Sequence, residues 1–308
     1  MGTPLTSSQF VRLLKETLRE VSEGAFNDLP GMKDKFYRTL DTSSAWEEFY
    51  SVGSLPDIPE FNGQLSWLVK YPGYYIKMEP KEYAAGVLIQ RKLVDDKKYD
   101  VLNSWAEELG SSGKRTQEKY AVRPFVYATS TAFDFITQYE EAVALASNSH
   151  TNKSGTSTTY GFDNLGTGAL NKTNLAAARL AMRKFRNDIS ERIEVGDDLA
   201  IVCPDALADT AFEIVGTDKG LYTAEGTKNM QYKRFEVIPY MRWDDYDTND
   251  WALVWKSQMK KDLLWLNRIA PEFKTTVDFD TYQTKHAIYF RFGYGWKGWH
   301  WIYFNQVS

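Results

Sequence analysis

The sequence LIQRKLVDDKKYDVLNSWAEELG, residues Leu88–Gly110, joins two different hydrophobic patterns. Its beginning continues the β-rich run EYAAGVLIQRKLV, which is typical of a strand. Its end carries apolar residues at the spacing of one helix face: Tyr99, Leu102, Trp105, Ala106 and Leu109. Asp95 and Asp96 lie between the patterns, and either side chain can cap the helix. This stretch therefore predicts a strand that leads directly into an amphipathic helix.

Glycine and proline predict interruptions after this helix. We expect a pause at GSSG, Gly110 to Gly113, and a resumed helix over residues 114–128 that Pro124 bends or restarts. Asn148–Gly168 is rich in Ser, Thr, Gly and Asn, which is the composition of a mobile loop or a domain boundary.

The residues before the helix predict a long β-hairpin over Gly63–Asp95. Its strands would be PGYYIKMEP and EYAAGVLIQRKLV, with a turn around Glu79–Lys81. Because the first strand has few aliphatic residues and several lysines, a solvated or partner-facing hairpin fits best. The preceding Lys33–Phe61 is aromatic but contains Pro56 and Pro59, so we expect an extended, irregular segment.

The two ends and the centre complete an α+β chain. Ser7 or Ser8 can cap an N-terminal amphipathic helix, which we expect Gly24 and Pro30 to end. The centre predicts a helix over Thr173–Arg192, a buried strand LAIVC (199–203) and a second helix over 205–215. FEVIPYM, WALVW, KHAIYFRF and WHWIYF all have the composition of strands.

Composition excludes several classes of protein. The 308 residues are 43% apolar and can bury a large core, but no run approaches the roughly 18 apolar residues of a membrane helix. The N-terminus lacks a secretory signal pattern, so we expect a soluble, unsecreted protein. One cysteine, Cys203, cannot form an internal disulfide, and a net charge of −4 disfavours strong nucleic-acid binding. The 10 Trp, 19 Tyr and 17 Phe imply an aromatic core or large contact surfaces.

Two acidic motifs are weak candidates for cation sites. Asp245, Asp247 and Asn249 match the start of an EF-hand loop, but Asp250 replaces its glycine and Lys256 its final glutamate. The motif DFDT, with Asp278 and Asp280, looks like the DxD of nucleotide-sugar enzymes, although a capped strand end explains it better. We predict no metal site.

Catalytic and cofactor motifs are incomplete. Gly110, Gly113 and Lys114 lack P-loop spacing, and Asn171 interrupts a dinucleotide fingerprint that begins at Gly166 and Gly168. The three histidines show no paired metal-ligand spacing: His150, His286 and His300. Cys203 lies in an apolar strand and fits an inert core thiol. We therefore predict no catalytic residue, no cofactor and no enzyme.

The C-terminal aromatic cluster has two interpretations. Its members are Trp296, Trp299, Trp301, Tyr303 and Phe304. Flat rings could stack on sugars, but strand alternation into a core or a subunit contact is the stronger hypothesis. The glycosylation motifs at Asn152 and Asn171 carry no weight without a signal sequence.

The order of these elements resembles the major capsid proteins of tailed phages, which have the Hong Kong 97 fold, and most closely the Mu-like major head subunit family. Two stretches carry the resemblance: Leu88–Gly110, and LLWLNRIAPEFKTTVDFDT from Leu263 to Thr281, which looks like the return from the central domain. ALASNSH (144–150) and FEVIPYM are weaker matches. The resemblance extends in order from Trp46 to the C-terminus.

The resemblance implies a domain map. Residues 1–50 would be the N-arm, 51–95 the E-loop, 96–150 with 263–308 the P-domain with its spine helix and sheet, and 151–262 the α/β A-domain. Because the arm begins almost at Met1, a separate scaffolding protein or an earlier cleavage is implied.

The implied function is that of a major capsid protein which assembles, as hexamers and pentamers, into an icosahedral shell. The shell would enclose the double-stranded DNA of a tailed phage or prophage, held non-specifically. The implied partners are further copies of the chain, a scaffolding protein and a portal protein, with decoration proteins left open and no membrane. The implied location is the virion, assembled in the bacterial cytoplasm. An encapsulin-like compartment and, remotely, a Trp-rich carbohydrate-binding protein or glycosidase are the alternatives.

In a shell, the arm and the hairpin would reach neighbouring subunits. We expect inter-subunit contacts from the arm through Phe10, Leu14, Leu18 and Val21, and from the hairpin through Tyr71, Tyr74, Tyr75, Ile76 and Lys77.

Overall fold

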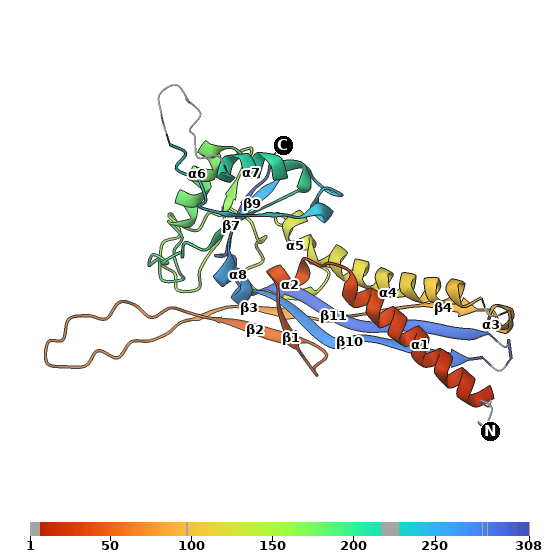
Figure 1. The fold of residues 1–308 in the computed structure, drawn as a ribbon. Coiled ribbons are helices and arrows are strands. Elements are labelled where there is room, and N and C mark those ends of the chain that lie inside the picture. Colours follow the sequence, from red (N-terminus) through yellow and green to blue (C-terminus); the bar gives the residue numbers. More distant parts are fainter. Residues whose placement is uncertain (1–6, 97, 217–227, 279, 282, 308) are drawn as a thin grey trace.

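The computed structural model describes residues 7–96, 98–216, 228–278, 280–281 and 283–307. Figure 1 shows an elongated part that contains α1, α4 and a long sheet, and a second part above it around β7 and β9. A long loop after β2 extends away from both, in the direction opposite to the free end of α1. Helices and strands are mixed, as the α+β prediction requires.

The elongated part is built on a four-stranded sheet. In spatial order its strands are β1 (Arg38–Asp41), β10 (Leu263–Val277), β11 (Thr284–Trp296) and β4 (Lys81–Ile89). β10 and β11 form a long antiparallel hairpin, β4 pairs antiparallel with β11, and β1 pairs parallel with the first residues of β10. Helices α1 (Ser7–Asp28) and α4 (Tyr99–Ala121) contact each other and this sheet.

The long helix α4 runs through GSSG without a pause, so that prediction is wrong. A Cβ atom at Gly110 would overlap the backbone oxygen of Ser22, and one at Gly113 would overlap the side chain of Ile288. The glycines therefore let α1 and the sheet approach α4 closely, which tertiary packing favours over the weak helix propensity of glycine. The restart at Pro124 is confirmed, because Pro124 lies in the first turn of α5 (Arg123–Val126).

The predicted hairpin turn at Glu79–Lys81 is also wrong. β3 (Pro72–Met78) pairs with β2 (Glu47–Val52) and β5 (Ile136–Tyr139) in a separate three-stranded sheet, while β4 pairs with β11. The chain thus passes from one sheet to another at Glu79 and Pro80. The physical reason is burial: Ile76, Met78 and Pro80 are inside the molecule, where a solvent-exposed hairpin turn would not be.

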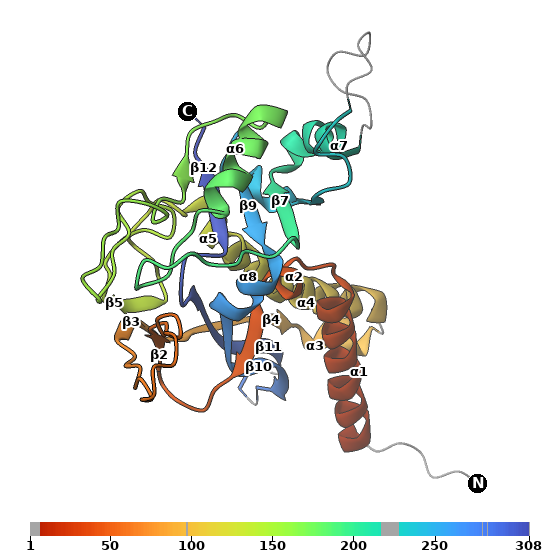
Figure 2. The ribbon, with the colours of Figure 1, turned by 90° about the vertical axis from the view of Figure 1, so that its left-hand side faces the viewer.

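The second part surrounds a five-stranded sheet. In spatial order its strands are β6 (Leu165–Gly166), β12 (Ile302–Asn305), β9 (Trp251–Trp255), β7 (Leu199–Cys203) and β8 (Glu236–Pro239). The helices beside it are α6 (Lys172–Met182) and α7 (Ala208–Gly216), and the remaining short helices are α2 (Lys33–Phe36), α3 (Arg91–Asp95) and α8 (Lys256–Asp262). Figure 2 shows α6 and α7 near this sheet and α1 away from it.

The strand LAIVC is confirmed as the fully buried β7, whereas the helix predicted over Thr173–Arg192 ends ten residues early. After Met182 the chain closes a tight turn in which the backbone N–H of Phe185 donates to the carbonyl of Met182. Phe185 is nevertheless buried, so the apolar spacing continues past the end of the helix.

Aromatic side chains fill the main core. Trp243, Trp251, Trp265, Trp296 and Trp301 are each less than 2% exposed. The ring of Phe292 stacks on that of Trp265, with centroids 4.5 Å apart. The core interpretation of the C-terminal aromatic cluster is therefore confirmed for Trp296, Trp301 and their buried neighbours. A second, smaller cluster lies under α1 and consists of Leu18, Ile89, Leu102 and Ala106.

Candidate functional site

The extended loop, residues 53–71 between β2 and β3, has no regular secondary structure and protrudes from the body (Figure 1). Seven of its large apolar side chains are between 47 and 89% exposed: Leu55, Ile58, Phe61, Leu65, Trp67, Val69 and Tyr71. Scattered apolar residues on a surface are ordinary, but a contiguous set on one protruding segment marks a contact surface. Gly63 adopts a φ of 100° within the loop, a conformation that glycine tolerates best.

The residues around β3 that we predicted as subunit contacts follow directly after the extended loop: Tyr71 is its last residue, and Tyr74, Tyr75, Ile76 and Lys77 lie on β3. Tyr71 is 51% exposed at the end of the loop, whereas Ile76 is 1% exposed and packs inside its own chain, so its contact with another subunit stays a prediction that this burial does not favour. The hydroxyl groups of Tyr74 and Thr151 lie 2.7 Å apart. The ring of Tyr75 packs against that of Tyr50, with centroids 5.7 Å apart.

Lys77 is also engaged within its own chain. Its ammonium lies 4.6 Å from the ring centroid of Trp46 and 3.4 Å from a carboxylate oxygen of Glu79. The apolar residues between Leu55 and Val69 were missed by sequence reasoning. The sequence feature that could have identified them as an exposed contact surface is a set of large apolar residues, in a segment with two prolines, whose spacing fits neither a strand nor a helix.

The N-terminal arm packs on its own chain. Leu18 is fully buried in the small cluster with Ile89 and Leu102, so a subunit contact through Leu18 would require α1 to leave this position, and the contact stays a prediction. Leu14 and Val21 are partly buried against the same cluster. The side chain of Phe10 lies outside the described residues. The arm was expected to lack an intrachain partner because no segment adjacent to it in sequence covers its apolar stripe, and α4 and β4 come more than 50 residues after its end.

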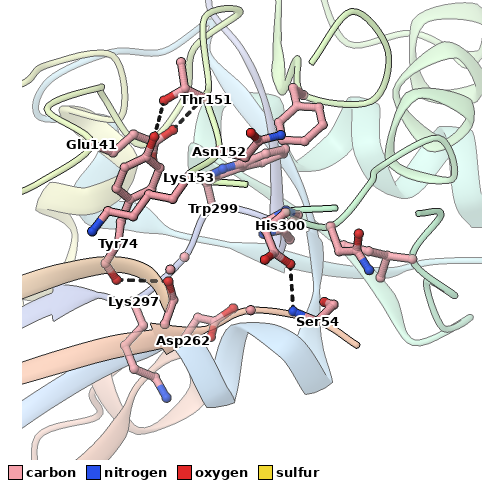
Figure 3. A pocket seen from close by; sticks show the side chains of 18 of the residues that line it. Ser54, Tyr74, Glu141, Thr151, Asn152, Lys153, Asp262, Lys297, Trp299 and His300 are labelled. Carbon is pink, nitrogen blue, oxygen red and sulfur yellow. Dashed lines mark hydrogen bonds between the residues drawn. The ribbon is translucent and has the colours of Figure 1, made fainter. Parts of the chain in front are cut away.

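A cleft of about 660 Å³ lies where the base of the extended loop meets the part built on the five-stranded sheet (Figure 3). The backbone N–H of Ser54 donates to Oδ1 of Asp188 at 2.8 Å. The backbone carbonyl of Asp188 in turn accepts from the hydroxyl groups of Ser154 and Thr156. Asp188 therefore ties the base of the extended loop to the body and sets the direction in which the loop leaves it.

The ionisable groups around the cleft are mostly paired with one another. Nδ1 of His150 lies 3.0 Å from Oε1 of Glu141, and the His150 ring stacks on Trp299 at 4.2 Å between centroids. Burial raises the pKa of Glu141, but hydrogen bonds from His150 and from the backbone N–H of Thr151 outweigh it and leave the pKa lowered.

His300 is held as a neutral ring. Its Nε2–H donates to the backbone carbonyl of Arg186 at 3.0 Å, and burial lowers the pKa of His300 to about 4. Burial also raises the pKa of Asp262 at the floor of the cleft. These contacts position chain segments, and we assign the cleft a structural role at the loop base.

The acidic motifs serve as turn caps. Oδ1 of Asp247 accepts from the backbone N–H groups of Asn249 and Asp250, at 2.7 and 2.8 Å. Oδ1 of Asp278 accepts from the backbone N–H of Asp280 at 3.1 Å. Within the described ranges, no group of three or more His, Cys, Asp or Glu side chains is arranged to hold a metal ion.

The other weak motifs have structural roles too. Asn171 caps α6, its side chain accepting from the backbone N–H of Asn174. Cys203 is fully buried in β7, and burial raises its pKa to about 12, so the thiol is not activated. Among the helices that the structure describes, none is both long and apolar enough to cross a membrane.

Comparison with known structures identifies the same architecture in viral shells. The mature capsid of bacteriophage PhiM1 matches with a TM-score of 0.57 and 9% identity, over 91% of this chain and 88% of that one. The capsid of Cyanophage P-SCSP1u matches with a TM-score of 0.56 and 14% identity, over 91% and 88%. A virus-like particle from Pyrococcus furiosus matches with a TM-score of 0.53 and 9% identity, over 95% and 99%.

At identities this low, the structural similarity establishes the fold alone. The family is established by the match of the chain to a protein-family model. No curated protein matches the chain. The model of the phage capsid protein family, in contrast, matches residues 75–304, which is most of the chain and includes β4, α4 and the β10–β11 hairpin. The chain therefore belongs to the phage capsid protein family.

Proposed function

We propose that this chain is the major capsid protein of a tailed phage or prophage and assembles into an icosahedral shell around packaged double-stranded DNA. The observation that carries the proposal is the extended loop, whose large apolar residues are exposed on a segment that its own chain leaves uncovered. Membership of the phage capsid protein family supports it.

The geometry supports a head-to-tail contact between copies. A groove lies between β4 and α4. In Figure 1 these two elements lie on the side of the molecule opposite the extended loop. It is lined by Val87, Leu88, Trp105, Glu108, Leu109, Ser112 and Arg115. Leu88 and Trp105 are 56 and 37% exposed there. When two different surfaces of one chain bind each other, copies form a ring if the rotation closes, and hexamers and pentamers are such rings.

We propose a domain map adjusted to the strand pairing. The E-loop would comprise β2, the extended loop and β3, that is, residues 47–78. The P-domain would comprise β4, α4 and the β10–β11 hairpin. The A-domain would comprise the five-stranded sheet, including β12 at the C-terminal end, and the N-arm would be α1 and α2. The closeness to the Mu-like subfamily stays a prediction.

The finer points of function follow from the same proposal. We infer that the protein does no chemistry, that it assembles in the bacterial cytoplasm, and that a scaffolding protein and a portal protein act with it. The mild net charge of −4 suits a container that does not grip its DNA. An encapsulin-like compartment has the same fold requirements, and genes for a portal and a terminase beside this one would decide between the two.

Self-association tests the proposal. Under assembly conditions, with scaffolding protein present, light scattering is expected to give a mass far above the 35.4 kDa of one chain, and electron microscopy should show closed shells. Each subunit contact can be weak because many act together. A species that stays monomeric with its scaffold present would contradict the shell, and glycan binding by that monomer would favour the carbohydrate-binding alternative.

A further inference from the structure

A buried chain of hydrogen bonds connects the N-terminal arm to the long sheet. Nε2 of His286, on β11, lies 2.8 Å from Oγ of Ser22 on α1. Nδ1 of the same ring lies 2.8 Å from Oγ1 of Thr275 on β10. The side chains of His286 and Ser22 are both 0% exposed.

The donors and acceptors fix the tautomer that the neutral ring of His286 adopts. Oγ of Ser22 also lies 2.8 Å from the backbone carbonyl of Ala106 on α4, which can only accept, so the single hydroxyl hydrogen of Ser22 is used there. The bond between Ser22 and His286 must then be donated by Nε2–H of the ring. In a neutral ring Nδ1 carries no hydrogen, so it accepts from the Thr275 hydroxyl.

In the part of the chain that the structure describes, no acidic side chain acts on the pKa of His286. Phe273 on β10 stacks against the ring of His286 at 6.1 Å between centroids. The register partner of His286 on β4 is Val87. Among the described residues, burial is the sole cause that lowers the pKa of His286. The neighbouring charged residues pair with one another: Arg19 with Glu23 on α1, Glu108 with Arg115 on α4, Glu272 with Lys274 on β10, and Asp278 with Lys285 beside β11.

We propose that Ser22, His286 and Thr275 form a proton-operated latch, which holds α1 on the body while His286 is neutral and releases it when the ring gains a second proton. Because a charged ring is costly to bury without a counter-charge, protonation favours the arrangement in which α1 is lifted and the ring reaches water. Release is limited to the part of α1 around Leu18, which packs on the small cluster, because Phe26 near the end of α1 packs against the main aromatic core. It would uncover Leu18 for a contact with another copy.

The test is amide hydrogen exchange on the full-length, unassembled chain at pH 7.5 and 5.5, corrected for the intrinsic pH dependence of exchange. His286 binds a proton more readily when α1 is open, so protection of α1 is complete above the ordinary histidine pKa of about 6.5 and declines below it. At pH 5.5, one unit lower, the protection factors of α1 are expected to fall about tenfold. Those of β7, in the main core, should change much less.

Three variants separate the latch from general acid weakening. His286→Gln keeps a donor toward Ser22 but cannot be protonated, so α1 protection should no longer respond to pH. Ser22→Ala should loosen α1 at both pH values, and His300→Gln, at a histidine that bonds to Arg186 and not to α1, should leave the response of α1 intact. The wild-type measurement decides the matter even where a variant fails to fold. Equal loss of protection in α1 and β7, or an unchanged α1 in the wild type, would overturn the latch.

Discussion

Substituting the exposed apolar residues of the extended loop is expected to abolish shell formation while leaving the subunit folded. In the variant Ile58→Ser/Phe61→Ser/Trp67→Ser, three side chains that are 89, 70 and 88% exposed become polar. Because they contribute little to their own chain, the free energy of unfolding should change by no more than about 1 kcal/mol. In the wild type, burial of each of these side chains on a neighbouring subunit would stabilise the contact by ~1.5 to 3 kcal/mol. In the variant, every subunit of the shell loses all three contributions.

The matched control keeps the apolar character at the same positions. The variant Ile58→Leu/Phe61→Leu/Trp67→Phe should retain most assembly, since contact surfaces tolerate changes of shape better than changes of polarity. Denaturant unfolding of the unassembled subunit gives stability, and light scattering with electron microscopy gives assembly. If the serine variant formed normal shells, the extended loop would not be part of the contact between subunits. A large loss of stability would mean instead that the loop belongs to the folded core.

The strand pairing also decides which part of the hairpin region can be changed safely. Residues Tyr71–Lys81 include β3, which lies in the centre of its three-stranded sheet and buries Ile76 and Met78. Deleting that segment would remove core side chains, whereas the apolar loop before it is free of such contacts. The interface test therefore belongs to the loop and not to β3.

Local sequence patterns predicted the elements but not their partners. The strand and helix in Leu88–Gly110 were predictable, because alternation and helical spacing are local properties. The partner of β3 was not, since β2 and β5 lie on either side of it in sequence and both compete with the nearer β4. Pairing is set by which strands bury Ile76 and Met78 together, and that depends on residues such as Ile136, about sixty positions away.

The candidate contact surface was predictable only in outline. An aromatic excess without a catalytic constellation indicated subunit contacts, yet most of the Trp residues are in the core. The arm stripe had the right spacing for burial, but sequence alone could not show that α4 and β4 of the same chain cover Leu18. Whether an apolar side chain is exposed depends on which other segments of the folded chain cover it, and a local sequence pattern does not contain that information.

Glycines in the two helices α1 and α4 give a pair of substitutions with opposite expected signs. At Gly110 a new Cβ would overlap the backbone oxygen of Ser22, and a backbone atom cannot rotate away as a side chain can. Gly110→Ala should therefore push α1 off α4 and lower the free energy of unfolding by about 1 to 3 kcal/mol, the usual cost of overpacking. Gly24 in α1 has open space around its Cβ position, with no atom within 4 Å.

Gly24→Ala is thus the matched control, in which only helix propensity changes. It should raise the free energy of unfolding by about 0.5 to 1 kcal/mol, because alanine loses less backbone entropy than glycine on folding into a helix. Denaturant unfolding of both variants and the wild type measures the signs directly. If Gly110→Ala were as stabilising as Gly24→Ala, the two helices could not be in close contact at Ser22. If both substitutions were stabilising, the result would contradict the close packing of α1 on α4. It would then also contradict the proposed latch, because the hydrogen bond between Ser22 and His286 depends on that packing.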